Sequence, residues 1–348
     1  MELASGHTVE ELEGEELKRM ERDFLGYTDG AVRIMPGRWF FPSAFVKFAE
    51  NYYKFKFRES DVVVMTWPKC GTTWTQEIVW TMRNNPDLDN PEAKISTFNR
   101  VPFIEMDTIL ASKNIPPSED DAGLMAAFEK LCPDGDPKEG IFFQIAQATP
   151  DSRTLKTHLP FSLLHPELLD TAKVVYVARN PMDVVVSFLH HSRLLKVTDF
   201  AGTLDQFVQY FVDDDLLYGP YWLHLKEAWE RRDHPNLHFV FFEELKKNNL
   251  AELRKLNKFL ETNLTEEQLQ KVARYTNFSE MKVREDQQAD DLRNSLANQD
   301  YLNSHGGFLR KGEVGDWKQH LGLEHKAMID HWIERHLKDI GVSFPHSS

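Results

Sequence analysis

The sequence of 348 residues is poor in cysteine and in positive charge, and it contains no long apolar stretch. It carries 41 lysines and arginines against 55 aspartates and glutamates, a formal net charge of −14 at pH 7. Nucleic acids and anionic membranes bind basic surfaces, so this balance argues against either as a general partner. Any anionic ligand must therefore be held by local groups.

The only cysteines are Cys70 and Cys132, and they form no C-x-x-C pair. No apolar segment opens the chain as a signal peptide would, and no stretch approaches the roughly 20 apolar residues of a membrane span. We therefore expect a soluble, cytoplasmic protein with reduced thiols. The 14 histidines form no H-E-x-x-H motif, so no metal site is predicted.

Hydrophobic residues make up 41% of the chain, enough for a substantial core. Length alone allows about two domains, but we predict one domain over residues 43–345, preceded by an acidic arm and lead-in over residues 1–42. The first twenty residues are acidic and weakly patterned, which predicts a mobile arm or a short solvated helix. Residues 116–139 and 285–305 are polar and rich in turn formers, which predicts loop or lid segments.

Three apolar runs predict buried strands: residues 61–66 (DVVVMT), 173–179 (KVVYVAR) and 237–242 (LHFVFF). The first two lead directly into segments with helical spacing of apolar residues. Continuous apolar strands that alternate with amphipathic helices are typical of parallel sheets. The sequence therefore predicts an α/β fold with a central parallel sheet flanked by helices.

A short loop, residues 68–73 (PKCGTT), joins the first strand to its helix. Backbone N–H groups, the helix dipole and two hydroxyls can converge there on an anion, so the loop predicts a phosphate site. The loop is not a Walker A motif, because G-x-x-x-x-G-K-[ST] is absent and Lys69 precedes the glycine. A kinase would also need Mg²⁺ ligands and a kinase signature, and the sequence shows neither.

Extended to residues 66–74 (TWPKCGTTW), the stretch resembles the 5′-phosphosulfate-binding loop of the cytosolic sulfotransferases. Three later blocks resemble the same family in the expected order: residues 156–160 (KTHLP), 176–187 (YVARNPMDVVVS) and 308–318 (FLRKGEVGDWK). The resemblance implies an α/β fold with a P-loop-like strand-loop-helix phosphate site. It also implies transfer of a sulfuryl group from 3′-phosphoadenosine 5′-phosphosulfate (PAPS) to the hydroxyl of a small, largely apolar acceptor.

The resemblance implies three catalytic residues, Lys69, Lys156 and His158. Sulfuryl transfer needs stabilisation of the charge that develops on the leaving oxygen, and Lys69 can supply it. Lys156 resembles the family lysine that assists at the sulfuryl group. His158, with an unperturbed pKa near 6.5, suits a general base that receives the proton of the acceptor hydroxyl.

The family also implies two sets of binding residues. Trp74 corresponds to the aromatic that stacks on adenine, although core packing is its alternative role, and Arg179 and Ser187 correspond to ligands of the 3′-phosphate. The complete nucleotide set is Lys69, Cys70, Gly71, Thr72, Thr73, Trp74, Arg179, Ser187, Thr276, Phe278, Arg310, Lys311 and Gly312. The expected acceptor pocket comprises Phe103, Phe45, Phe161 and Phe308, with core packing as the alternative for Phe103.

The chain departs from the family pattern at several points. Cys70 replaces a serine, which leaves the role of that position open, and Phe242 replaces a tyrosine, so we exclude Phe242 from the predicted site. The dimer motif K-x-x-x-T-V-x-x-x-E is not matched from Lys318 onward, so dimerisation through that motif is unsupported and the oligomeric state stays open. The acidic insertion after Ile115 resembles the insect retinol dehydratase branch.

Two further functions remain open. Membership of the dehydratase branch would imply sulfation of an allylic alcohol followed by loss of sulfate. A non-catalytic adenine-nucleotide-binding protein would keep Lys69 and Arg179 but would not need His158, so the complete KTHLP block favours an enzyme.

Overall fold

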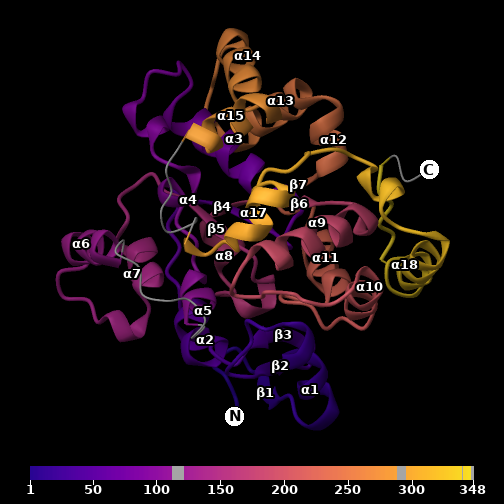
Figure 1. Ribbon diagram of the computed structural model, residues 1–348. Coiled ribbons are helices and arrows are strands. Elements are labelled where there is room, and N and C mark those ends of the chain that lie inside the picture. Colours follow the sequence, from indigo (N-terminus) through magenta and orange to yellow (C-terminus); the bar gives the residue numbers. More distant parts are fainter. Residues whose placement is uncertain (112–120, 288–294, 339, 346–348) are drawn as a thin grey trace.

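The computed structural model describes residues 1–111, 121–287, 295–338 and 340–345. In this part of the chain, a four-stranded parallel sheet in the order β5-β4-β6-β7 lies at the centre of the molecule (Figure 1). Its strands are β4 (Val62–Thr66), β5 (Thr154–Thr157), β6 (Lys173–Ala178) and β7 (Leu237–Phe241). The predicted fold, a parallel sheet flanked by helices, is confirmed.

Alternating side chains of the sheet enter two separate apolar layers. In β4, Val63 and Met65 belong to the larger core cluster, whereas Val62 and Val64 belong to the smaller one. Helices of the smaller cluster are α3 (Thr72–Asn84), α12 (Phe242–Lys247), α13 (Asn249–Leu260) and α14 (Glu266–Tyr275). Helices of the larger cluster include α2 (Phe45–Tyr53), α9 (Pro181–Leu194), α10 (Leu204–Val212), α11 (Tyr221–Glu230) and α18 (Leu323–His336). Both sheet faces are therefore covered, as continuous apolar strands require.

Residues 1–42 were predicted to be an acidic arm and lead-in, with a mobile arm or a short solvated helix in the first twenty residues, and the structure shows regular elements there. These residues form an antiparallel sheet of β1 (Thr8–Glu11), β2 (Ala31–Met35) and β3 (Trp39–Pro42), with α1 (Gly14–Asp23) between β1 and β2 (Figure 1). A few apolar residues of this segment, such as Leu12 and Met20, are buried in the larger core cluster. Arg33 of β2 also pairs with Asp215, at 2.8 Å, with both side chains nearly buried. These few buried contacts fix the segment to the core, whereas the prediction relied on its acidic average composition.

Short helices lie in the connections between the sheet strands and in the segment after β7. They are η1 (Pro91–Lys94), α4 (Thr97–Arg100), α5 (Met106–Leu110), α6 (Asp121–Leu131), η2 (Pro137–Glu139), α7 (Ile141–Ala148), η3 (Phe161–Leu163), α8 (Leu168–Thr171), α15 (Phe278–Gln287), α17 (Gln299–His305) and η4 (Asp316–Gln319). The two predicted loop segments, 116–139 and 285–305, are thus partly helical. Alanine, leucine and methionine give α6 a high helix propensity that the polar flanks concealed. Residues 112–120 and 288–294 lie outside the described residues.

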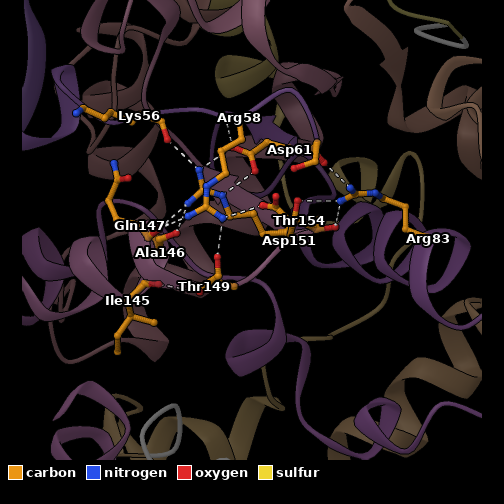
Figure 2. Close-up of polar contacts among 12 residues, drawn as sticks. Lys56, Arg58, Asp61, Arg83, Ile145, Ala146, Gln147, Thr149, Asp151 and Thr154 are labelled. Carbon is orange, nitrogen blue, oxygen red and sulfur yellow. Dashed lines mark hydrogen bonds and ion pairs between the residues drawn. The ribbon is translucent and has the colours of Figure 1, made fainter. Parts of the chain in front are cut away.

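A buried ion pair holds the amino ends of β4 and β5 together. Nε and Nη2 of Arg153 donate to the two carboxylate oxygens of Asp61, at 2.6 and 2.8 Å. Both side chains are fully buried. The other Arg153 donors reach the carbonyl oxygens of Lys56, Ala146 and Gln147, which are labelled in Figure 2. The guanidinium thus joins the lead-in to β4, the start of β5 and the end of α7.

Arg83 extends this network to α3. Its guanidinium donates to the carbonyl oxygens of Arg153 and Ser60, at 2.8 and 2.6 Å, and to the Thr154 hydroxyl, at 2.9 Å (Figure 2). The helix that follows β4 is therefore tied at its carboxyl end to the start of β5.

We predict that Arg153→Met lowers the free energy of unfolding by about 3–5 kcal/mol, because it leaves the Asp61 carboxylate buried without its cation. Urea denaturation measures the change. Arg254→Met, which removes the exposed pair with Glu266, is the control and should leave the urea midpoint unchanged. A loss below about 1 kcal/mol in Arg153→Met, the range of a surface pair, would contradict a structural role for the buried pair.

Candidate active site

A cavity of about 260 Å³ lies at the carboxyl ends of the central strands. Lys69 follows β4, His158 follows β5 and Arg179 follows β6, and all three line this cavity. The strands pair in parallel register, so their carboxyl ends meet at one edge of the sheet. Open α/β sheets bind their ligands at this edge.

The loop after β4 is shaped by a close contact between Gly71 and Phe242. Gly71 has φ +107°, and a Cβ atom on it would lie 2.7 Å from Cδ2 of Phe242. Only glycine tolerates both the backbone conformation and the contact. Helix α3 then begins at Thr72, whose hydroxyl lies 2.7 Å from that of Thr66. The amino end of α3 is thereby directed toward the cavity, as an anion site requires.

His158 is held in one orientation by a backbone contact. Its Nδ1 lies 2.8 Å from the carbonyl oxygen of Thr66 and therefore carries the hydrogen that this oxygen accepts. Nε2 is then the unprotonated nitrogen of a neutral ring. Burial, reinforced by the nearby positive charge of Lys156, lowers the pKa of His158 well below 6.5.

Glu105 accepts hydrogen bonds from the His158 backbone and from the side chain of the preceding residue. Its Oε1 accepts a hydrogen bond from the His158 N–H at 2.5 Å, and its Oε2 accepts one from the Thr157 hydroxyl at 2.8 Å. Burial raises the pKa of Glu105, and these hydrogen bonds oppose the rise. Glu105 was missed from the sequence, although it follows Phe103 by only two residues.

The two candidate catalytic lysines lie in the same cavity as His158. Lys69 and Lys156 line it, and Nζ of Lys156 stands 3.8 Å from the centre of the Phe103 ring. Burial lowers the pKa of Lys156, and the Glu105 carboxyl limits the drop. The cavity therefore combines cationic groups with a neutral imidazole.

Arg179 lies where the loop after β6 faces the loop after β4. Its guanidinium stacks over the Phe242 ring, 4.4 Å from the ring centre, and donates to the carbonyl oxygens of Lys69 at 3.2 Å and Glu313 at 2.9 Å. Its buried Nε has no hydrogen-bond partner in the part of the chain that the structure describes. Arg179 thus retains a buried donor, and Ser187 of α9 lines the same cavity.

The closing segment brings further cations to the cavity. Arg310 and Lys311 each contact the Asp316 carboxylate at 2.6 Å. Gly312 has φ +63°, and a Cβ atom there would lie 2.4 Å from Cδ2 of Phe278. The segment therefore packs its backbone directly against the Phe278 ring, and a ligand would have to compete with Asp316 for both cations.

Most of the predicted site residues line this one cavity. They are Lys69, Gly71, Thr72, Thr73, Trp74, Phe103, Lys156, His158, Arg179, Ser187, Phe278, Phe308, Arg310, Lys311 and Gly312. The structure thereby brings together residues that are up to 243 positions apart, from Lys69 to Gly312.

Four predicted site residues do not line this cavity. Cys70 is fully buried with its Sγ 3.9 Å from the Tyr221 hydroxyl, and burial raises the pKa of the thiol to about 12. The Thr276 hydroxyl donates to a carbonyl within its own helix, while the Thr276 carbonyl accepts a bond from Trp74 Nε1 at 2.7 Å. Phe45 and Phe161 are buried in the larger core cluster instead. Their aromatic character was a poor guide because it serves packing equally well.

Phe242, which was excluded from the predicted site, lines the cavity. It contacts the Arg179 guanidinium and meets Trp74 edge to face at 5.6 Å. The sequence prediction had considered only the hydroxyl that this position lacks. The ring itself packs between the phosphate loop and the cation.

Two negative findings concern the described residues. They contain no group of three or more His, Cys, Asp or Glu side chains placed to hold a metal ion. None of the described helices is long and apolar enough to cross a membrane.

Comparisons with known proteins identify the class. Residues 59–341 match the family model of the sulfotransferase domain, which shows that the chain belongs to the sulfotransferase family and is a PAPS-dependent sulfotransferase enzyme. It is 32% identical over 308 residues to sulfotransferase 1A1 of Canis lupus familiaris, covering 86% of this chain and 91% of the relative. It is 30% identical over 304 residues to luciferin sulfotransferase of Photinus pyralis, covering 86% and 77%.

A solved structure resembles nearly the whole chain. Retinol dehydratase in complex with androsterone and the inactive cofactor PAP (3′-phosphoadenosine 5′-phosphate) superposes with a TM-score of 0.81 at 29% identity. The match covers 97% of this chain and 98% of that one. A retinol complex of retinol dehydratase with PAP gives a TM-score of 0.80.

We predict that Gly71→Ala weakens PAP binding by about tenfold or more, a change of at least about 1.4 kcal/mol, because the new Cβ must displace Phe242 or the phosphate loop. It should also lower the free energy of unfolding by about 1–3 kcal/mol. Gly6→Ala is the matched control, because Gly6 has φ +76° but nothing within 4 Å of the added Cβ. Calorimetry with PAP separates the two variants, and equal PAP affinity in both would contradict a role for the Gly71 contact in nucleotide binding.

Proposed function

We propose that the protein transfers the sulfuryl group of PAPS to the hydroxyl of a small, largely apolar acceptor, with His158 as general base. The observation that supports this most directly is that Lys69, Lys156 and His158 face one cavity at the edge of the sheet. Membership of the sulfotransferase family supplies the donor.

The chemistry needs one bond to form and one to break at sulfur. The acceptor oxygen attacks sulfur while the bond between sulfur and the bridging phosphate oxygen breaks. Lys69 stabilises the charge that develops on the departing oxygen, and Lys156 neutralises charge on the sulfuryl group. The proton of the acceptor hydroxyl passes to Nε2 of His158.

The orientation of His158 supports its proposed role. With the hydrogen on Nδ1 donated to Thr66, the lone pair of Nε2 is available for a proton. The lowered pKa keeps the ring neutral at cellular pH, so the base is present in its active form.

The nucleotide would extend from the phosphate loop toward the closing segment. We assign the 5′-phosphosulfate to the loop with Gly71, Thr72 and Thr73, and the adenine to Trp74 and Phe278. The 3′-phosphate is assigned to Arg179, Ser187 and the Arg310-Lys311-Gly312 segment. The unpartnered Nε of Arg179 supports this last assignment, because a bidentate phosphate contact would satisfy it.

The acceptor would occupy the apolar part of the cavity. Phe103, Met106, Ile109, Phe188 and Phe308 line that part. The structurally similar retinol dehydratase binds androsterone and retinol, which are apolar molecules that carry a hydroxyl. We therefore assign this protein an acceptor of comparable character.

Sulfation followed by dehydration is the second candidate function. The extent of the match to retinol dehydratase, which covers 97% of this chain, supports it. With an allylic alcohol as acceptor, the two functions differ in their product: a stable sulfate ester, or a dehydrated product and free sulfate.

We further propose that residues 43–345 form one catalytic domain and that the protein acts in the cytoplasm on small molecules. Nucleic acid and membrane surfaces are not its partners in this proposal, because the net charge is −14.

Turnover of PAPS with a panel of phenols, steroids and retinol tests the proposal, with products identified by mass spectrometry. We expect a sulfate ester for at least one acceptor. Lys69→Met should cut turnover by about 10² or more while the melting temperature stays constant, because it removes the charge at the leaving oxygen. A loss below about fivefold would contradict the role of Lys69.

His158→Ala should abolish transfer but leave PAP affinity unchanged, because the imidazole is assigned to the acceptor proton and to no phosphate. In the wild type, kcat/KM should fall as the pH drops, with the ascending limb below pH 6.5, because burial lowers the pKa of the base. Any residual activity of the variant should lack this limb. Near-normal turnover in His158→Ala would overturn the assignment.

A further inference from the structure

His191 is a polar residue within the apolar part of the cavity. It lies on α9, four residues after Ser187, and both side chains line the cavity. Four helical residues correspond to a rise of about 6 Å, so one face of α9 extends from the proposed phosphate site into the acceptor region. The His191 ring centre is 6.3 Å from that of Phe188 and 6.0 Å from that of Phe308.

Nδ1 of His191 is buried without a hydrogen-bond partner among the residues that the structure describes. The large majority of buried side-chain polar atoms in proteins are paired, and an unpaired one costs roughly 1–3 kcal/mol. The His191 side chain lines a cavity that holds a ligand under the proposed function. A polar group of that ligand would satisfy Nδ1 if it reached this atom.

Two neighbouring polar residues do not share this property. His190 has contacts on both nitrogens, at 3.2 Å from the Gly307 carbonyl oxygen and 3.3 Å from the Tyr301 hydroxyl. The Thr198 hydroxyl donates to the Ser192 carbonyl at 2.8 Å. His191 is therefore distinguished from these neighbours by its unsatisfied nitrogen.

The charge state of His191 limits the group that it can bind. Burial, together with the positive charges of Lys69 and Lys156, lowers the pKa of His191 well below 6.5. The ring is then neutral and offers one N–H donor and one acceptor nitrogen. Such a ring can pair with an uncharged oxygen. A carbonyl oxygen accepts a hydrogen bond from the ring N–H, and a hydroxyl can either accept from the N–H or donate to the other ring nitrogen.

We propose that His191 determines acceptor specificity by selecting molecules that carry a second uncharged oxygen, a ketone or a hydroxyl, besides the hydroxyl that is sulfated. The inference deepens the proposed function and rests on it, since it takes the cavity as the acceptor site. A site built to hydrogen-bond a ligand group discriminates against the analogue that lacks it, because the site's own polar atom stays unpaired.

Matched acceptor pairs test the proposal: 4-(4-hydroxyphenyl)butan-2-one against 4-butylphenol, and estrone against estra-1,3,5(10)-trien-3-ol. Within each pair, the phenol is the same and the ketone is remote from it. Calorimetry on the protein loaded with PAP gives the ratio of the two dissociation constants. For at least one pair, the wild type should prefer the ketone by about tenfold, which corresponds to about 1.4 kcal/mol.

Two substitutions separate hydrogen bonding from shape. His191→Phe keeps a planar ring but removes the nitrogen, so the ratio should fall to about one and the apolar member should bind better. His191→Asn places an amide near the position of Nδ1 and should retain most of the preference. Melting temperatures of both variants establish that they are folded.

A wild-type preference below about twofold in both pairs would overturn the proposal, whatever the variants do. So would a preference that His191→Phe leaves unchanged. Binding does not require transfer, so the result is distinct from a failure of the proposed function. Selective binding without any sulfated product would contradict the function but not the role of His191, whereas sulfated product without selectivity would contradict only the latter.

Discussion

The parallel pairing of β4 with both β5 and β6 is the constraint on which the site depends. Val62 is in register with Thr154 on one side and with Lys173 on the other, so the three strands end at the same edge of the sheet. The residues that follow each strand, rather than any local motif, then meet in one cavity. Asp61 and Arg153 anchor the opposite ends of β4 and β5, and a slip of one residue would reverse the faces of every side chain.

Burial determines the charge states of the side chains at that edge of the sheet. It lowers the pKa of both His158 and Lys156, and Lys156 also depresses that of His158 through its charge. The result is a neutral imidazole beside cationic side chains. A neutral imidazole can accept a proton, and the cationic side chains can hold an anionic sulfuryl donor. Glu105 holds the backbone at His158 and contributes a buried carboxyl to the same balance.

The sequence predicted the parts of this arrangement that depend on local pattern. The strands β4, β6 and β7 appear as apolar runs, and the loop with Lys69 follows from its position before a helix. The closing cations Arg310 and Lys311 could be assigned only through family resemblance, because nothing local relates them to Lys69. Contacts that depend on tertiary packing were missed, as for Glu105, and Phe45, which was predicted for the acceptor pocket, packs in the larger core cluster. The N-terminal sheet was missed because its few buried residues are scattered among acidic ones.

A crystal structure with PAP and 2-naphthol would test the central claim most directly. The account predicts the naphthol oxygen within hydrogen-bond distance of Nε2 of His158, at about 2.6–3.2 Å. It also predicts the 5′-phosphate at the loop that contains Gly71, and a 3′-phosphate that contacts Arg179. A naphthol hydroxyl directed away from His158, in a complex whose nucleotide occupies that loop, would contradict the account.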